Sequence, residues 1–239
     1  MALLMALLPY LCGLYERLLV QAQFWLLSVL TSGPVPRHIA FIMDGNRRYA
    51  RRCDMKVQKG HQAGASTLRR MVEVCIKINV YCISAYAFSL ENFNRPSEEV
   101  DFLFGYLTKM LMDACEDGSF TRSDLFERYG VRLNVIGRVE LFPETLQRVI
   151  RIAERNTRSN NRLMFNLYMP YTSQDEMTKA IQNCVQNASK MNDLNPDTYF
   201  VQEETDKHLM TSIHGSPPLD ILVRTSGVKR LSDFMLWQV

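Results

Sequence analysis

Five short apolar runs alternate with segments of helical periodicity along most of this chain, and this alternation limits the fold more than any other feature. In the segments between the runs, apolar residues recur every three or four positions, which is typical of helices that bury one face. The runs lack in/out alternation, as expected for strands buried on both faces of a parallel sheet. They span residues 38–43, 81–88, 131–136, 163–168 and 220–223. The sequence therefore predicts an α/β fold with a single central parallel sheet flanked by helices.

Residues 1–32 precede this pattern and differ from it in composition. Glu16 and Arg17 are the only charges among residues 1–30, and they divide two apolar halves. Neither half reaches the roughly 18 residues that suggest a spanning helix, and no basic start of a signal peptide is present. We expect an apolar, membrane-associating helical segment that lies on the cytosolic leaflet or is partly inserted into it. A helix that packs on the domain and a tilted spanning helix are the alternatives. Residues 33–239 then form the main domain.

The overall charge excludes one class of partner. A net charge of +3 with 22% charged residues describes an ordinary globular chain. So weak an excess argues against a protein that coats nucleic acid, and no nucleic-acid partner is expected. A preference for anions has to come from local basic clusters.

Polar motifs follow three of the expected strands. They comprise residues 44–46, 89–95 and 224–227. Ligands of parallel α/β sheets bind beyond the carboxyl ends of the strands, so these motifs predict one site at that edge of the sheet.

The first motif combines a carboxylate, a glycine and two arginines. Asp44 at a strand end is suited to Mg²⁺, which prefers oxygen ligands and often bridges to phosphates. Gly45 lets the backbone approach an anion, and Asn46 could cap the next helix. Arg47 and Arg48 add positive charge. A simple capping turn with solvated arginines is the alternative.

A basic stretch continues to His61, with Arg51, Arg52, Lys56 and Lys59. Such a loop could cradle a diphosphate, although a run of charge is usually a solvated face. Both interpretations stay open from the sequence alone.

A second anion-binding candidate lies near the end of the chain. Arg224 to Gly227, with Arg230 and Ser232, places arginines and hydroxyls around a glycine turn, which suits the many acceptor oxygens of a diphosphate. Two basic clusters at one edge of a sheet indicate two phosphorylated substrates.

Residues 100–112 form an expected helix that is apolar on more than one face. It is either buried all round or contributes one face to an apolar tunnel, and the sequence favours neither.

These motifs together resemble the cis-prenyltransferase family, which includes undecaprenyl diphosphate synthase and, closest to this chain, eukaryotic dehydrodolichyl diphosphate synthase. The resemblance is carried by residues 38–50, 60–64, 85–93 and 224–234, in the order in which the family has them. It implies an enzyme that condenses isopentenyl diphosphate onto an allylic diphosphate, of the farnesyl type, to make a long polyprenyl diphosphate for dolichol synthesis and protein glycosylation. It also implies Mg²⁺, the cytosolic face of the endoplasmic reticulum membrane or a lipid droplet, and a homodimer or a heterodimer with a non-catalytic homologue.

The resemblance also assigns roles residue by residue. Asp44 matches the Mg²⁺-binding and catalytic aspartate, and Asn92 matches an asparagine assigned to proton removal or substrate positioning. The remaining matches bind substrates: Gly45, Asn46, Arg47, Arg48, Tyr49 and His61 around the allylic diphosphate; Ser89, Leu90, Glu91, Phe93 and Arg95 at the strand exit; and Arg224, Arg230, Leu231 and Ser232 around isopentenyl diphosphate.

The chain departs from the family pattern in two places. Val57 stands where the family usually has an arginine, and the family continues beyond Val239 with a last strand, a metal-binding glutamate and an Arg-x-Gly tail. We therefore expect a C-terminally truncated catalytic domain with an uncovered sheet edge. The alternatives are an inactive family member that only binds a partner or a membrane, and a different phosphate-binding α/β enzyme.

Overall fold

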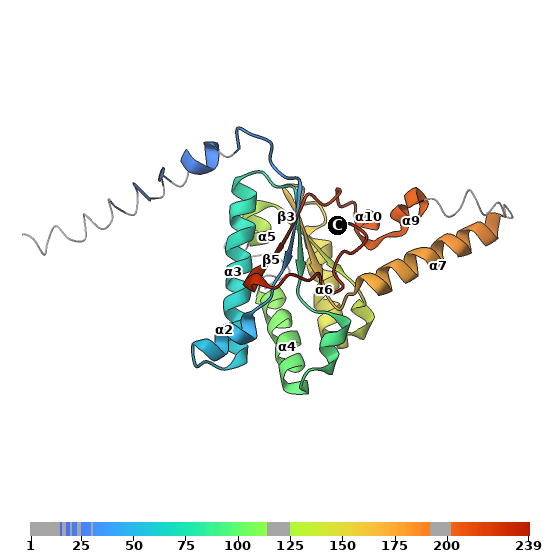
Figure 1. The fold of residues 1–239 in the computed structure, drawn as a ribbon, viewed down its shortest axis with the longest axis horizontal. Coiled ribbons are helices and arrows are strands. Elements are labelled where there is room, and N and C mark those ends of the chain that lie inside the picture. The colour runs from blue at the N-terminus through green and yellow to red at the C-terminus, as the bar shows by residue number, and fades with distance from the viewer. Residues whose placement is uncertain are drawn as a thin grey trace, which may run out of the picture.

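The computed structural model describes residues 15, 18–19, 21–22, 25–29, 31–113, 125–191 and 202–239. Figure 1 shows a central sheet with α3 (Val57–Lys77) and α4 (Ser97–Asp113) on one side and α7 (Ser173–Met191) on the other. The further helices are α2 (Asn46–Arg52), α5 (Leu125–Tyr129), α6 (Glu144–Thr157), α9 (Gln202–His208) and α10 (Met210–Ile213). The short 3₁₀ turns among the described residues are η1 (Leu90–Asn94), η3 (Val139–Leu141) and η4 (Thr225–Gly227).

The sheet has five parallel strands in the order β3-β4-β2-β1-β5, which confirms the predicted single parallel sheet. The strands are β1 (His38–Ile42), β2 (Cys82–Tyr86), β3 (Val131–Ile136), β4 (Leu163–Tyr168) and β5 (Ile221–Arg224). Every residue of β1, β2 and β4 is buried, as their continuous apolar runs predicted.

Burial of β5 on both faces was predicted wrongly. Ile221 is 43% exposed and Val223 is 37% exposed. Strand β5 lies at the edge of the sheet, and the described helices α3, α4 and α6 cover the strands farther from that edge.

Two apolar cores lie on opposite faces of the sheet. The larger joins α3, α4 and α6 to inward residues such as Phe41, Ile83 and Phe165. The smaller gathers Tyr86, Tyr168 and Phe234 on the face toward α7. Because side chains alternate along a strand, neighbouring strand residues feed different cores.

A row of buried polar side chains crosses the α7 face of the sheet. Asn134 Nδ2 donates to Asn166 Oδ1 at 2.8 Å, and Asn166 Nδ2 donates to Ser216 Oγ at 2.8 Å. His38 Nδ1 donates to the Pro217 carbonyl at 2.8 Å, and its Nε2 lies 2.8 Å from Ser84 Oγ. This row ties the loop before β5 to the central strands.

The predicted N-terminal segment falls mostly outside the described residues. Residues 25–29 are helical, and Trp25, Leu26 and Val29 are exposed. Among the residues that the structure describes, no helix is long and apolar enough to cross a bilayer. The structure thus does not establish the predicted apolar helix at residues 1–32.

Candidate active site

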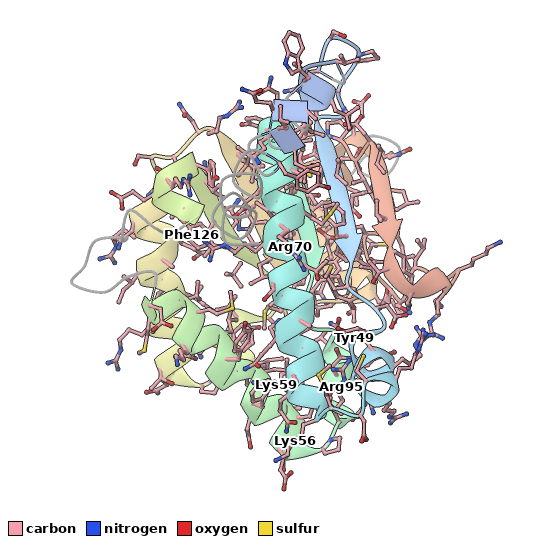
Figure 2. All side chains as sticks on the ribbon, turned by 90° about the vertical axis from the view of Figure 1, so that its left-hand side faces the viewer. Tyr49, Lys56, Lys59, Arg70, Arg95 and Phe126 are labelled. Carbon is pink, nitrogen blue, oxygen red and sulfur yellow. The ribbon has the colours of Figure 1, made fainter. Side chains whose placement is uncertain are left out.

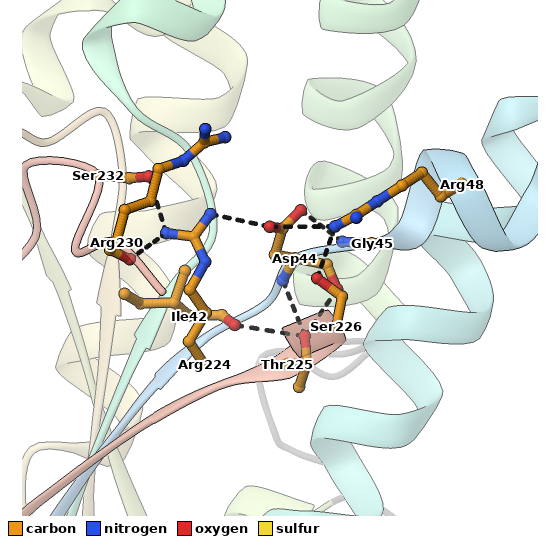
Figure 3. A network of polar contacts seen from close by, with 9 residues as sticks. All are labelled: Ile42, Asp44, Gly45, Arg48, Arg224, Thr225, Ser226, Arg230 and Ser232. Carbon is orange, nitrogen blue, oxygen red and sulfur yellow. Dashed lines mark hydrogen bonds and ion pairs between the residues drawn. The ribbon is translucent and has the colours of Figure 1, made fainter. Parts of the chain in front are cut away.

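The carboxyl ends of β1 and β5 lie side by side, and this brings two of the predicted motifs together. Ile42 pairs with Arg224 in the sheet register. Just beyond this pair, Arg224 Nη2 donates to Asp44 Oδ2 at 2.8 Å, and Arg48 Nη2 lies 3.4 Å from the same oxygen. Figure 3 shows Asp44 between the two guanidinium groups. The first motif and the last one therefore form a single cluster.

A tight turn at Gly45 holds Asp44 in place. Gly45 has φ +95°, a left-handed conformation that glycine adopts without strain, and its N–H donates to Asp44 Oδ1 at 2.6 Å. Thr225 Oγ1 accepts the Asp44 N–H at 2.9 Å and donates to the Asp44 carbonyl at 2.6 Å. The residue that caps α2 is Gly45, without a side-chain hydrogen bond, so the prediction that Asn46 caps this helix is wrong.

Opposing effects set the pKa of Asp44. Burial acts to raise the pKa, but the hydrogen bonds from Arg224 and from the Gly45 N–H, together with the charges of Arg224 and Arg48, outweigh burial and lower it. The carboxylate is thus ionised at neutral pH, as a metal ligand has to be.

Close contact between α2 and α3 explains the glycines at positions 60 and 64. A Cβ on Gly60 would lie 2.3 Å from the Asn46 carbonyl oxygen, and one on Gly64 would lie 2.5 Å from Asn46 Oδ1. Only glycine lets the two helices approach this far. The contact brings His61, on the same turns of α3, toward the arginines of α2.

A nearly buried carboxylate, Glu99, binds the other basic residues of the site. Glu99 Oε1 lies 3.1 Å from His61 Nε2 and 3.1 Å from Arg95 Nη1, while Arg47 Nε lies 3.9 Å from Oε2. No role was predicted for Glu99 from the sequence. Glu99 lies in the first turn of α4, and Arg95 lies just before that helix.

Burial lowers the pKa of His61, and the hydrogen bond and charge of Glu99 oppose this effect without reversing it. Neutral His61 can therefore donate one hydrogen bond and accept another near an anion.

A cavity of about 900 Å³ opens from this polar cluster between the sheet, α3 and α4. Asp44, Arg48, His61, Arg95 and Arg230 line its polar end. Its other walls are mostly apolar and include Leu68, Val72, Leu103, Leu107, Met110, Phe126 and Phe165. Figure 2 shows Arg95 and Phe126 toward opposite ends of the α3–α4 region. One end of the cavity is thus suited to an anion and the rest to a hydrocarbon.

Helix α4 contributes one face to this cavity. Leu103, Leu107 and Met110 line it, Phe104 packs in the core, and Met112 is 49% exposed. Of the two interpretations of residues 100–112, the structure supports the tunnel wall and contradicts a helix buried all round.

The other basic residues separate into two groups. Arg51 lines the cavity, whereas Arg52, Lys56 and Lys59 are exposed and do not line it. Figure 2 shows Lys56 and Lys59 at the end of α3 near Arg95. For these three residues the solvated face is the better interpretation.

The strand-exit group is used locally in this structure. Asn92 Oδ1 accepts the Ser89 N–H at 3.2 Å, and Ser89 Oγ accepts the Glu91 N–H at 3.2 Å, which closes a capping box on η1. Phe93 packs on Phe88 and Phe104. The predicted site residues that do not line the cavity are Tyr49, Ser89, Leu90, Glu91, Asn92, Phe93, Arg224, Leu231 and Ser232. The roles of all the predicted site residues stay predictions.

The donor set fits a metal that is shared with a substrate. Across the described residues, no three histidine, cysteine or acidic side chains gather to hold a metal. Mg²⁺ is commonly held by one or two carboxylates together with substrate phosphates. The single carboxylate of Asp44, at the edge of a basic cavity, is compatible with this arrangement.

Comparison with known proteins gives the family. Residues 42–239 match the undecaprenyl diphosphate synthase family model. The chain belongs to this family. It is 37% identical to a dehydrodolichyl diphosphate synthase complex subunit of Schizosaccharomyces pombe over 231 residues, which cover 95% of this chain and 83% of that protein.

Two further relatives agree with this membership. The human dehydrodolichyl diphosphate synthase complex subunit DHDDS is 36% identical over 211 residues, which cover 88% of this chain and 61% of the human protein. Lavandulyl diphosphate synthase from Lavandula x intermedia, solved in complex with dimethylallyl diphosphate, superposes with a TM-score of 0.75 at 30% identity. That similarity covers 85% of this chain and 83% of the plant chain.

Proposed function

We propose that this chain condenses isopentenyl diphosphate onto an allylic diphosphate, of the farnesyl type, and builds a long polycis-polyprenyl diphosphate of the dehydrodolichyl type. One observation carries the proposal: the arginine clusters of two distant motifs meet at Asp44, at the mouth of an apolar cavity of about 900 Å³. Two diphosphates and a growing hydrocarbon need such a combination.

We assign the basic residues of α2 and α3, together with Arg95 just before α4, to the allylic diphosphate. Arg47, Arg48, His61 and Arg95 lie on the cavity wall beside the opening of the apolar part. Guanidinium groups bind phosphate oxygens in pairs and stay charged at every physiological pH. They stabilise the charge that grows on the diphosphate as the allylic C–O bond breaks.

We assign the binding of the second diphosphate to Arg224, Arg230 and Ser232. Arg224 is nearly buried, and its Nε atom has no hydrogen-bond partner among the described residues. The double bond of isopentenyl diphosphate attacks the allylic carbon, a C–C bond forms, and a proton leaves. Asn92 is a poor base because its amide is neutral, so we assign it to orientation, with a phosphate or water accepting the proton.

Asp44 would hold the Mg²⁺ ion together with substrate phosphates. When bound, the ion supplies positive charge to the leaving diphosphate. The lowered pKa of Asp44 supports this role because a ligand carboxylate has to be ionised.

The names of two relatives support a proposal about partners. Proteins of Schizosaccharomyces pombe and human that resemble this chain are named subunits of dehydrodolichyl diphosphate synthase complexes. We propose a dimer with itself or a non-catalytic homologue, a role in dolichol synthesis, and a place on the cytosolic face of the endoplasmic reticulum. Residues 1–32 would associate with membrane lipid, and residues 33–239 would form the catalytic domain.

The test is incorporation of labelled isopentenyl diphosphate with farnesyl diphosphate and Mg²⁺, with and without lipid vesicles. Asp44→Asn is compared with Asp101→Asn, a matched change at an exposed position of α4. Long products that disappear with Asp44→Asn and persist with Asp101→Asn support the proposal. A folded chain that makes no product with lipid, with a partner subunit or with a C-terminal extension would favour a partner-binding role instead.

A further inference from the structure

The segment from Arg230 to Met235 follows an unusual backbone path beside the site. Ser232, Asp233 and Met235 have φ of +52°, +55° and +50°. Residues other than glycine rarely adopt the left-handed region, so surrounding contacts have to hold three of them within four positions.

Those contacts come chiefly from the first turn of α7. The Asp233 carbonyl accepts the Ser173 N–H at 2.8 Å, and Asp233 Oδ1 accepts the Gln174 N–H at 3.2 Å. Ser173 Oγ accepts the Leu236 N–H at 2.9 Å. Asp233 therefore satisfies two N–H groups that the start of a helix leaves without partners.

The other side of the segment faces Arg224. Arg224 Nη1 donates to Ser232 Oγ at 2.8 Å and to the carbonyl of Arg230. Phe234 is fully buried and stacks on Tyr86, with ring centroids 4.5 Å apart and planes 10° apart. Ser232, which contacts Arg224, and Asp233, which contacts α7, are thus consecutive residues.

We propose that Asp233 is a positioning residue that fixes Ser232 and the Arg230 carbonyl against Arg224, and so sets the guanidinium for the second diphosphate. This inference rests on the proposed function. Asp233 does not line the cavity; it acts through its attachment to α7.

The test uses the full chain with Asp233→Ala, Asp233→Asn and, as a control, Asp206→Asn. Alanine removes the Oδ1 acceptor and tolerates the left-handed backbone poorly, whereas asparagine keeps an acceptor and is favoured in that conformation. Asp206 accepts the Trp237 indole N–H farther along the same segment. Asp206→Asn therefore changes a contact of the same segment that does not hold Ser232. It separates a general loss of stability in the segment from a shift of Ser232.

We expect Asp233→Ala to raise KM for isopentenyl diphosphate about tenfold, the scale of one hydrogen bond to a charged group, with the starter KM within about twofold. Asp233→Asn should restore the KM, and Asp206→Asn should leave both KM values unchanged. Equal effects on both substrates, or no rescue by asparagine, would overturn the inference.

Two further measurements keep the test decisive. Should Asp233→Ala fail to fold, Gln174→Pro removes the donated N–H from the first turn of α7, where proline is tolerated, and should raise the same KM. Should the wild-type chain transfer no prenyl group, the proposed function fails by itself. Binding of inorganic pyrophosphate, followed by calorimetry, then tests Asp233→Ala, with about tenfold weaker binding expected and unchanged binding overturning the inference.

Discussion

His61 Nε2 lies 3.1 Å from Glu99 Oε1, and both side chains are only 11% exposed. The same carboxylate also meets Arg95 and Arg47. Glu99 thus holds three basic groups of the site at fixed positions, although no substrate-binding role was predicted for it.

Glu99→Gln should weaken the binding of the allylic substrate. The amide keeps the shape but removes the charge, so Arg47 and Arg95 lose their ionic partner. We expect kcat/KM for the starter to fall about 10- to 100-fold, the range for hydrogen bonds to charged groups. Steady-state kinetics with varied starter checks this, and Glu98→Gln, at an exposed neighbouring position, should behave as wild type.

Gly64→Ala should separate α2 from α3. A Cβ there would lie 2.5 Å from Asn46 Oδ1, and overpacking of this kind costs about 1–3 kcal/mol. The midpoint temperature of thermal unfolding and kcat/KM should both fall. Gly105→Ala is the matched control. Among the described residues, and apart from the nearby backbone of α4 itself, nothing lies within 4 Å of its Cβ position, so alanine should be neutral or stabilise α4 by about 0.5–1 kcal/mol. Equal effects of the two substitutions would contradict the packing argument.

Leu107→Trp should shorten the products. Leu107 lines the apolar part of the cavity, and a larger side chain removes space that the growing chain needs. Thin-layer separation of the dephosphorylated products gives the length distribution. Met112→Trp, at an exposed position of the same helix, should leave product length unchanged, and a shift in both variants would place the growing chain elsewhere.

Protonation of the buried His38 should make the fold less stable in mild acid. Burial lowers the pKa of His38, opposed by the Pro217 hydrogen bond and the Asp220 charge. Its folded pKa therefore lies below the unfolded value near 6.5. The associated stability is present above pH 6.5 and is lost as pH falls through the folded pKa.

Urea unfolding of wild type and His38→Gln at pH 8, 6.5 and 5 checks this. The difference in unfolding free energy between the two proteins should shrink toward pH 5. His61 also has a lowered pKa, so His61→Gln is measured in the same way to separate its contribution from that of His38. A difference in unfolding free energy between wild type and His38→Gln that stays constant across the three pH values would contradict the prediction.

The sequence predicted β3 and β4 to the residue, because short runs rich in apolar residues mark buried strands of a parallel sheet. The same rule failed for β5, because a run of apolar residues does not reveal that a strand lies at an edge. The cluster around Asp44 was foreseen from motifs that follow strands. Glu99, the carboxylate that contacts Arg47, His61 and Arg95, was not foreseen, because a charged residue on a helix normally faces solvent.

The strand-exit group shows a different limit of the sequence. Ser89 and Asn92 are polar residues of the kind that bind substrates, and equally of the kind that cap short helical turns. The structure uses both side chains for the turn. Spacing alone cannot separate these uses, since both need a hydrogen-bonding side chain just after a strand.

The hydrogen bond between Arg224 and Asp44 joins residues 180 positions apart in the sequence. During synthesis Asp44 leaves the ribosome long before its partner Arg224 is made. Among the described contacts of its carboxylate, those with Arg48 and the Gly45 N–H can form first. A nascent chain can thus form α2 and α3 early, whereas the cluster around Asp44 can be completed only after Arg224 of β5 has been made.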